Sequence, residues 1–65
     1  MKNVMTVIRN AQPVAMVFHT CDDMIDYAKT LPASELATAR YYELGYYGLY
    51  DQTDDFREAI ADELA

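Results

Sequence analysis

The sequence contains no tryptophan, one cysteine (Cys21), one histidine (His19) and only two glycines. A single cysteine cannot form an internal disulfide, and a structural zinc site needs four Cys or His ligands. The sequence therefore offers neither of the cross-links that commonly stabilise small domains. The two glycines, Gly45 and Gly48, do not make a glycine-rich phosphate-binding loop. We therefore expect no metal and no cofactor.

Basic residues are also scarce, and this limits the class of partner. The 65 residues include five Lys or Arg and eleven Asp or Glu, for a formal net charge of −6. Residues 1–19 carry two basic residues and no acid, whereas residues 20–65 carry all eleven acids. Binding to DNA, RNA or an anionic membrane requires Lys and Arg to neutralise phosphate. We therefore expect the partner to be neither a nucleic acid nor a membrane, and a basic protein is the natural alternative.

Long hydrophobic runs are missing as well. No stretch approaches the roughly 20 apolar residues that a membrane span needs. The first residues also lack the small-residue cleavage site of a secretion signal. Together with the lone cysteine, this leads us to expect a cytoplasmic protein. The length, and the 52% of residues that are hydrophobic, predict one small domain over residues 1–65.

The chain begins with a pattern typical of strands. Residues 4–9 alternate between two faces and are rich in β-branched side chains, and residues 10–13 then supply turn chemistry before a second extended apolar run. This predicts a β-hairpin with strands at about residues 4–9 and 13–19. Because a two-stranded hairpin is marginal in water, the segments that follow must cover one of its faces.

Helical patterns follow the hairpin. Thr20 can cap the first of three short helices, and Gly45 can end the second. The three helices are expected at about residues 21–31, 34–44 and 53–64. The fold class predicted is therefore α+β, with the N-terminal hairpin packed against three helices. Residues 46–50 fit either a loop or a short helical continuation, and no internal repeat is recognisable in the sequence.

Candidate catalytic groups are few. His19 and Cys21 are close in sequence, and a thiol near a helix N-terminus can be reactive, but free cysteines are mostly small buried hydrophobes. The carboxylates in residues 51–55 lack the alternating ligands, the central glycine and the terminal glutamate of a calcium loop. We assign no catalytic residue and do not expect an enzyme.

The acids and the tyrosines are the candidate partner-binding residues. On the third predicted helix the acids recur on one face, opposite an apolar stripe, and five tyrosines fall within residues 41–50. Carboxylates attract a basic partner, and tyrosine is enriched at binding hot spots. The acids predicted to contact the partner are Asp51, Asp54, Asp55, Glu58 and Asp62, and the tyrosines are Tyr42, Tyr46, Tyr47 and Tyr50. Alternatively, the acids form a solvated face that only keeps the protein soluble.

Two functions fit these patterns. Rows of carboxylates on a rigid helix can imitate nucleic-acid phosphates, so the first hypothesis is an acidic protein that inhibits or sequesters a basic, nucleic-acid-handling protein. In size and acidity the chain resembles the phage- and plasmid-encoded inhibitors of bacterial defence, such as antirestriction and anti-CRISPR proteins, although no motif is shared. The alternative is a structural or regulatory module that self-associates as a homodimer, through the edges of residues 5–9 or 14–18 or through the tyrosines.

Overall fold

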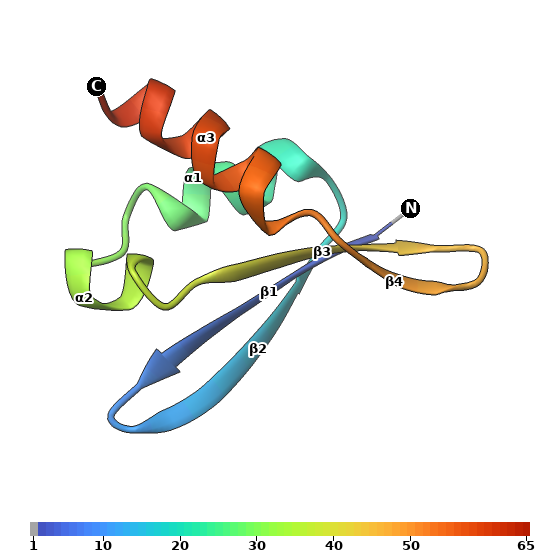
Figure 1. Ribbon diagram of the computed structural model, residues 1–65, viewed down its shortest axis with the longest axis horizontal. Coiled ribbons are helices and arrows are strands. Elements are labelled where there is room, and N and C mark those ends of the chain that lie inside the picture. The colour runs from blue at the N-terminus through green and yellow to red at the C-terminus, as the bar shows by residue number, and fades with distance from the viewer. Residues whose placement is uncertain (1) are drawn as a thin grey trace.

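The computed structural model describes residues 2–65 and shows an α+β fold, as the sequence predicts. A four-stranded antiparallel sheet lies against a layer of helices, and all the helices lie on the same side of the sheet (Figure 1). The elements, in chain order, are β1 (Lys2–Arg9), β2 (Gln12–Phe18), α1 (Cys21–Ala28), α2 (Ala33–Leu36), β3 (Arg40–Gly45), β4 (Gly48–Asp51) and α3 (Thr53–Leu64).

The N-terminal hairpin forms where the sequence predicts it. β1 and β2 pair antiparallel, with Arg9 opposite Gln12 and Asn3 opposite Phe18. Asn10 and Ala11 make the two-residue turn, and both have positive φ angles, of 53° and 64°. Such a turn matches the right-handed twist of the flanking strands, and Asn tolerates the left-handed conformation better than most residues.

The second predicted helix, over residues 34–44, is wrong over most of its length. α2 ends at Leu36, and Arg40–Gly45 form strand β3, which pairs with β1. The Thr38 hydroxyl donates a hydrogen bond to the Glu35 carbonyl (2.8 Å) and accepts one from the Ile8 amide (3.0 Å), which ties the end of α2 to β1. Helical spacing was present in this segment, but pairing with the free edge of β1 satisfies more backbone groups and suits consecutive tyrosines.

Residues 46–50 form a loop only at Tyr46 and Tyr47, and they do not continue a helix. Tyr46 and Tyr47 form a turn, and Gly48–Asp51 form strand β4, so that β3 and β4 make a second hairpin with Gly45 opposite Gly48. Gly48 has a φ angle of 131°, which only glycine adopts readily. The tyrosine-rich segment is therefore a hairpin that projects from the sheet (Figure 1).

The chain folds as two ββα units. The first contains β1, β2 and α1, and the second contains β3, β4 and α3, with α2 in the connection between them. The sheet order β2-β1-β3-β4 is unchanged when the units are exchanged. Met5 pairs with Tyr41, 36 positions further on, and the turn residues Asn10 and Tyr46 are separated by the same interval. A pseudo-two-fold axis therefore passes close to the Met5–Tyr41 pair, although the two units share little sequence.

The core lies between the sheet and the helices, around this pair. Alternation along β1 places Asn3, Met5 and Val7 toward the helices. The buried hydrophobic residues are Met5, Val7, Met24, Ala28, Ala39, Tyr41 and Ile60. All but Ala39 lie on β1, β3, α1 or α3, so the two units share one core. This small set of side chains supplies most of the hydrophobic stabilisation.

Replacing Met5 with alanine should destabilise the fold strongly. Met5 is 0% exposed at the centre of the core, and truncating such a side chain costs about 2–5 kcal/mol of unfolding free energy. Chemical denaturation followed by circular dichroism would measure this loss. Tyr47→Ala, at a position 88% exposed, should stay within about 0.5 kcal/mol of the wild type. Equal effects of the two changes would contradict the assigned core.

Candidate protein-binding surface

The net negative charge of the protein is confined to its two longer helices. Residues 21–29 and 53–64, which comprise α1 with its C-cap and α3, carry eight acids and two basic residues, for a net charge of −6. The rest of the chain carries three acids and three basic residues and is neutral overall. The layer formed by α1 and α3 is therefore acidic, while the strands, α2 and the connections together carry no net charge.

The outer face of α3 is the strongest part of this acidic layer. Asp54, Asp55, Glu58 and Asp62 are all exposed, and helical periodicity places them on one side, away from Ile60. Within residues 2–65 none of these four carboxylates forms an ion pair. Asp22 and Asp23 add two exposed acids on the first turn of α1.

Neither basic residue of the helical layer neutralises this face. Arg57 points toward the connection before β3, where its guanidinium donates hydrogen bonds to the Ala37 carbonyl (3.2 Å) and the Ala39 carbonyl (3.0 Å). Lys29 pairs with Glu63 (3.1 Å) and lies 3.6 Å from Asp26, and hydrogen bonding to Glu63 raises the pKa of the lysine. These contacts hold α3 against the connection and α1, and leave the outer carboxylates uncompensated.

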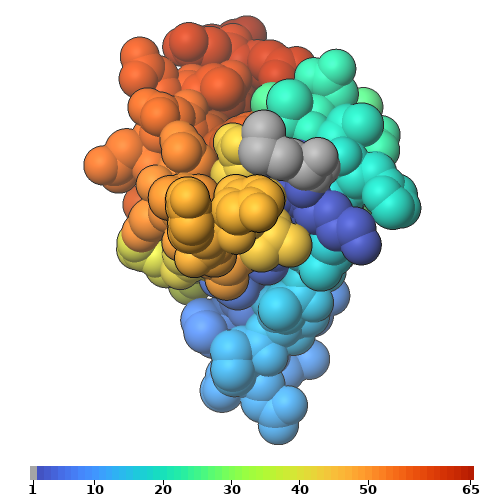
Figure 2. Space-filling view, turned by 90° about the vertical axis from the view of Figure 1, so that its right-hand side faces the viewer, coloured from blue at the N-terminus to red at the C-terminus, as the bar shows by residue number. Residues whose placement is uncertain are grey.

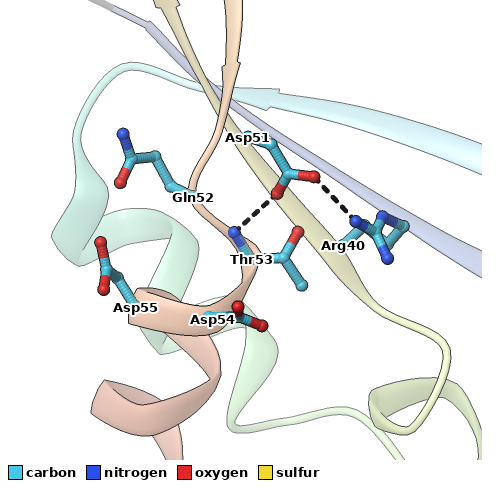
Figure 3. Close-up of a pocket in the computed structure, with 6 residues that line it drawn as sticks. All are labelled: Arg40, Asp51, Gln52, Thr53, Asp54 and Asp55. Atoms are coloured by element: carbon cyan, nitrogen blue, oxygen red, sulfur yellow. Dashed lines mark hydrogen bonds and ion pairs between the residues drawn. The ribbon is translucent and has the colours of Figure 1, made fainter.

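Asp51 differs from the other predicted acids because it is engaged within the fold. Its carboxylate accepts a hydrogen bond from the Thr53 amide (2.9 Å) and pairs with the Arg40 guanidinium (2.7 Å), as Figure 3 shows. Hydrogen bonding from Thr53 and pairing with Arg40 lower the pKa of Asp51 to about 2. Asp51 thus joins the end of β4 to the first turn of α3, which is a structural role.

Thr53 completes this junction from the other side. Its hydroxyl accepts a hydrogen bond from the Tyr41 amide (3.1 Å) and donates one to the Tyr41 carbonyl (3.3 Å), and its side chain is buried. The Gln52 amide also donates to the Tyr41 carbonyl (2.9 Å). These bonds fix where α3 leaves the sheet, and so fix the direction in which its acidic face points.

A pocket of about 270 Å³ lies at this junction (Figure 3). It is lined by Arg40, Asp51, Gln52, Thr53, Asp54 and Asp55. Within it the Asp51 carboxylate is already bonded to Arg40 and to the Thr53 amide, whereas Asp54 and Asp55 form no ion pair within residues 2–65. Within residues 2–65 no group of three or more His, Cys, Asp or Glu side chains is arranged to hold a metal ion.

The four predicted tyrosines do not form one cluster. Tyr46 and Tyr47, at the tip of the second hairpin, are 93% and 88% exposed, and their ring centroids lie 5.1 Å apart in an edge-to-face arrangement. Tyr50 lies on the helix side of β4 over Gly45, where an added Cβ would overlap its ring. Tyr42 lies on the opposite side of the sheet, and its hydroxyl accepts a hydrogen bond from Arg40 (3.2 Å).

The exposed tyrosine pair and the acidic helices share one side of the molecule. Figure 2 shows the β3–β4 hairpin at the centre of the view, with α3 on one side of it and the start of α1 on the other. We name the exposed acids of α3 and α1 that form no ion pair within residues 2–65, together with this tyrosine pair, the acidic surface. Its members are Asp22, Asp23, Asp54, Asp55, Glu58, Asp62, Tyr46 and Tyr47.

Both candidate catalytic groups lie at the protein surface. Cys21 is an exposed free thiol at the first position of α1, and His19 is also exposed.

Among the residues that the structure describes, no helix is long and apolar enough to cross a membrane. Comparison of the chain with protein-family models, with curated proteins and with solved structures found no match. The acidic surface is therefore the candidate functional site of the protein.

Replacing Asp51 with asparagine should change the response of the fold to acid. The folded-state pKa of Asp51, about 2, is below the ordinary value of 3.8, so its ionised form stabilises the fold above about pH 4 and this stabilisation is lost as the pH falls toward about 2. Asp51→Asn should lower the thermal unfolding midpoint at neutral pH, and the difference from the wild type should shrink at about pH 2. Glu58→Gln removes a carboxylate without such contacts, so any difference between its unfolding midpoint and that of the wild type should not shrink in the same way as the pH falls.

Proposed function

We propose that this protein binds a basic surface of a nucleic-acid-handling protein through its acidic surface, and blocks access of nucleic acid to that partner. The observation that carries the proposal is the segregation of charge. The whole net charge of −6 belongs to α1 and α3, and four acids on α3 have no ion-pair partner within residues 2–65. Like charges on one helix face repel one another, and a basic partner would remove that cost.

The spacing of the carboxylates on α3 supports mimicry of nucleic acid. Asp54 and Asp62 are eight residues apart, which corresponds to about 12 Å along a helix axis. Four carboxylates over this length give about one negative charge per 4 Å, against about one per 3.4 Å along a single DNA strand. A protein surface that grips successive phosphates would meet a similar linear charge density on this helix.

The exposed tyrosine pair supplies what charge alone does not. Carboxylates steer a partner at long range, but their attraction is screened by salt and gives little specificity at close range. Tyr46 and Tyr47 present two rings and two hydroxyls at the tip of a hairpin. Such side chains can enter a pocket and add apolar contact area at low entropic cost.

The proposal predicts capture of nucleic-acid-binding proteins that DNA displaces. We expect proteins retained from a bacterial lysate at low salt to be released by about 0.5 M salt and by excess duplex DNA, because both compete with the carboxylates. Mass spectrometry would identify the captured proteins. Retention that duplex DNA does not reduce would contradict mimicry.

Two charge changes provide the matched comparison. Glu58→Gln and Gln12→Lys each raise the net charge by one, but Glu58 lies on the acidic surface, whereas the exposed Gln12 lies at the start of β2, next to the turn of the first hairpin. Glu58→Gln should weaken binding of the captured partner severalfold, whereas Gln12→Lys should have a much smaller effect. Equal losses would show that only the overall charge matters, and the proposed surface would then be wrong.

A further inference from the structure

The second face of the sheet carries apolar side chains and is not covered. Within residues 2–65 every helix lies on the other face (Figure 1). Strand alternation and register place on this open face the residues Val4, Thr6, Ile8, Pro13, Ala15, Val17, Tyr42, Leu44 and Leu49. Antiparallel strands with one face in water ordinarily alternate apolar and polar residues. Here the strands are apolar on both faces, which is typical of a sheet covered on both sides.

The register joins these side chains into a continuous patch. Val4 lies opposite Val17 on one side and opposite Tyr42 on the other, so one row crosses three strands. Leu44 lies opposite Leu49 in the neighbouring row. Four large aliphatic side chains of this face are substantially exposed: Ile8 46%, Val17 63%, Leu44 41% and Leu49 57%. Contiguous exposed apolar surface of this kind marks an interaction site.

The charges on the open face favour a second copy of this chain as its occupant. Only Lys2, Arg40 and Asp51 carry charge there by register, and Arg40 and Asp51 neutralise each other at 2.7 Å. An acidic partner would be repelled by the net charge of −6, and a basic one would be drawn to the helical layer instead. A second copy offers an apolar, nearly uncharged face of the same shape.

Stacking two open faces also keeps the acidic surfaces apart. Packed layers are separated by about 10 Å, so two sheets back to back place the two helical layers about 30 Å apart. This distance is several Debye lengths at physiological salt, where the Debye length is about 8 Å. The repulsion between the two acidic layers is then largely screened, and each layer remains free on the outside.

The area of the open face suits a small dimer. The strands contain 8, 7, 6 and 4 residues, and at about 3.3 Å along and 4.8 Å across for each residue they cover on the order of 400 Å² in projection. Side-chain relief makes the accessible area larger, so that two copies would bury on the order of 1,000 Å² in total. This is the lower end of the range for a specific interface and indicates a weak, concentration-dependent dimer.

We propose that two copies of this protein associate through their open sheet faces, which gives a four-layer dimer with an acidic surface at each end. This interface differs from the edge and tyrosine routes to self-association that the sequence suggests. β2 pairs with β1 along residues 3–9 and β3 pairs with it along residues 2–6, and the tyrosines are divided between the two faces of the sheet. The dimer does not depend on the partner proposed above, and its interface leaves the acidic surface exposed.

Sedimentation equilibrium of the full chain tests this dimer. The weight-average mass should rise from that of one chain toward that of two between about 10 μM and 1 mM, as expected for a weak interface. Because the contact is apolar, association should persist at about 0.5 M salt, unlike the partner binding proposed above. A mass of one chain at every concentration would overturn the proposal, whatever the outcome of the lysate experiment.

Matched lysine substitutions locate the interface. Leu49→Lys on the open face and Leu64→Lys at the end of α3 change the charge equally at positions that are 57% and 51% exposed. Leu49→Lys, and independently Val17→Lys, should weaken dimerisation at least tenfold, because each would bury a charge in the apolar interface, whereas Leu64→Lys should leave dimerisation unchanged. Circular dichroism would verify that each variant folds. If the dimer persists in both open-face variants, the proposal is overturned. Pairing through the edge of β2 would give this result.

Discussion

Met5 and Tyr41 face each other across the two central strands, and their burial determines which side of the sheet the helices cover. The pair lies close to the pseudo-two-fold axis, so it belongs equally to both ββα units. Each unit alone would be a two-stranded hairpin with one helix, which cannot bury enough apolar surface to be stable. Pairing of β1 with β3 gives the two units a common core, and the helices must follow onto the same side.

The distribution of surface chemistry is a consequence of this arrangement. With α1 and α3 on one side, their exposed acids form a single acidic layer. Arg57 and Lys29, which could have neutralised that layer, are engaged with backbone carbonyls and with Glu63. The opposite side is an apolar sheet face with one compensated ion pair. The molecule therefore presents two different surfaces, one acidic and one apolar.

The junction between β4 and α3 connects fold stability with the acidic surface. Thr53 bonds to both backbone groups of Tyr41, and Asp51 holds the Thr53 amide and Arg40. These short-range contacts set the position of a twelve-residue helix, four of whose acids form no ion pair within residues 2–65. Since each contact involves residues near the sheet, the orientation of the acidic face is determined by the core rather than by the exposed acids themselves.

Local sequence determined the elements whose signals are short-range. Residues close in sequence determine the N-terminal hairpin and the start of α3 at Thr53. They also determine the start of α1, where the Thr20 hydroxyl accepts a hydrogen bond from the Asp23 amide (3.1 Å). The acids of α3 share a face because helical periodicity requires it. The sequence also shows that β1 has apolar residues on both of its alternating faces. It does not show that the helices cover only one of these faces, and this is what leaves the other apolar face exposed.

Tertiary structure decided what local patterns left ambiguous. Residues 40–45 are compatible with a helix, and they form a strand because β1 has a free edge that only a distant segment can pair with. That pairing separates the tyrosines, since neighbours along a strand point to opposite faces, and it turns Asp51 from a free acid into the partner of Arg40. The composition of this protein made it acidic and small, but only long-range strand pairing placed the acids on one side and left an apolar face on the other.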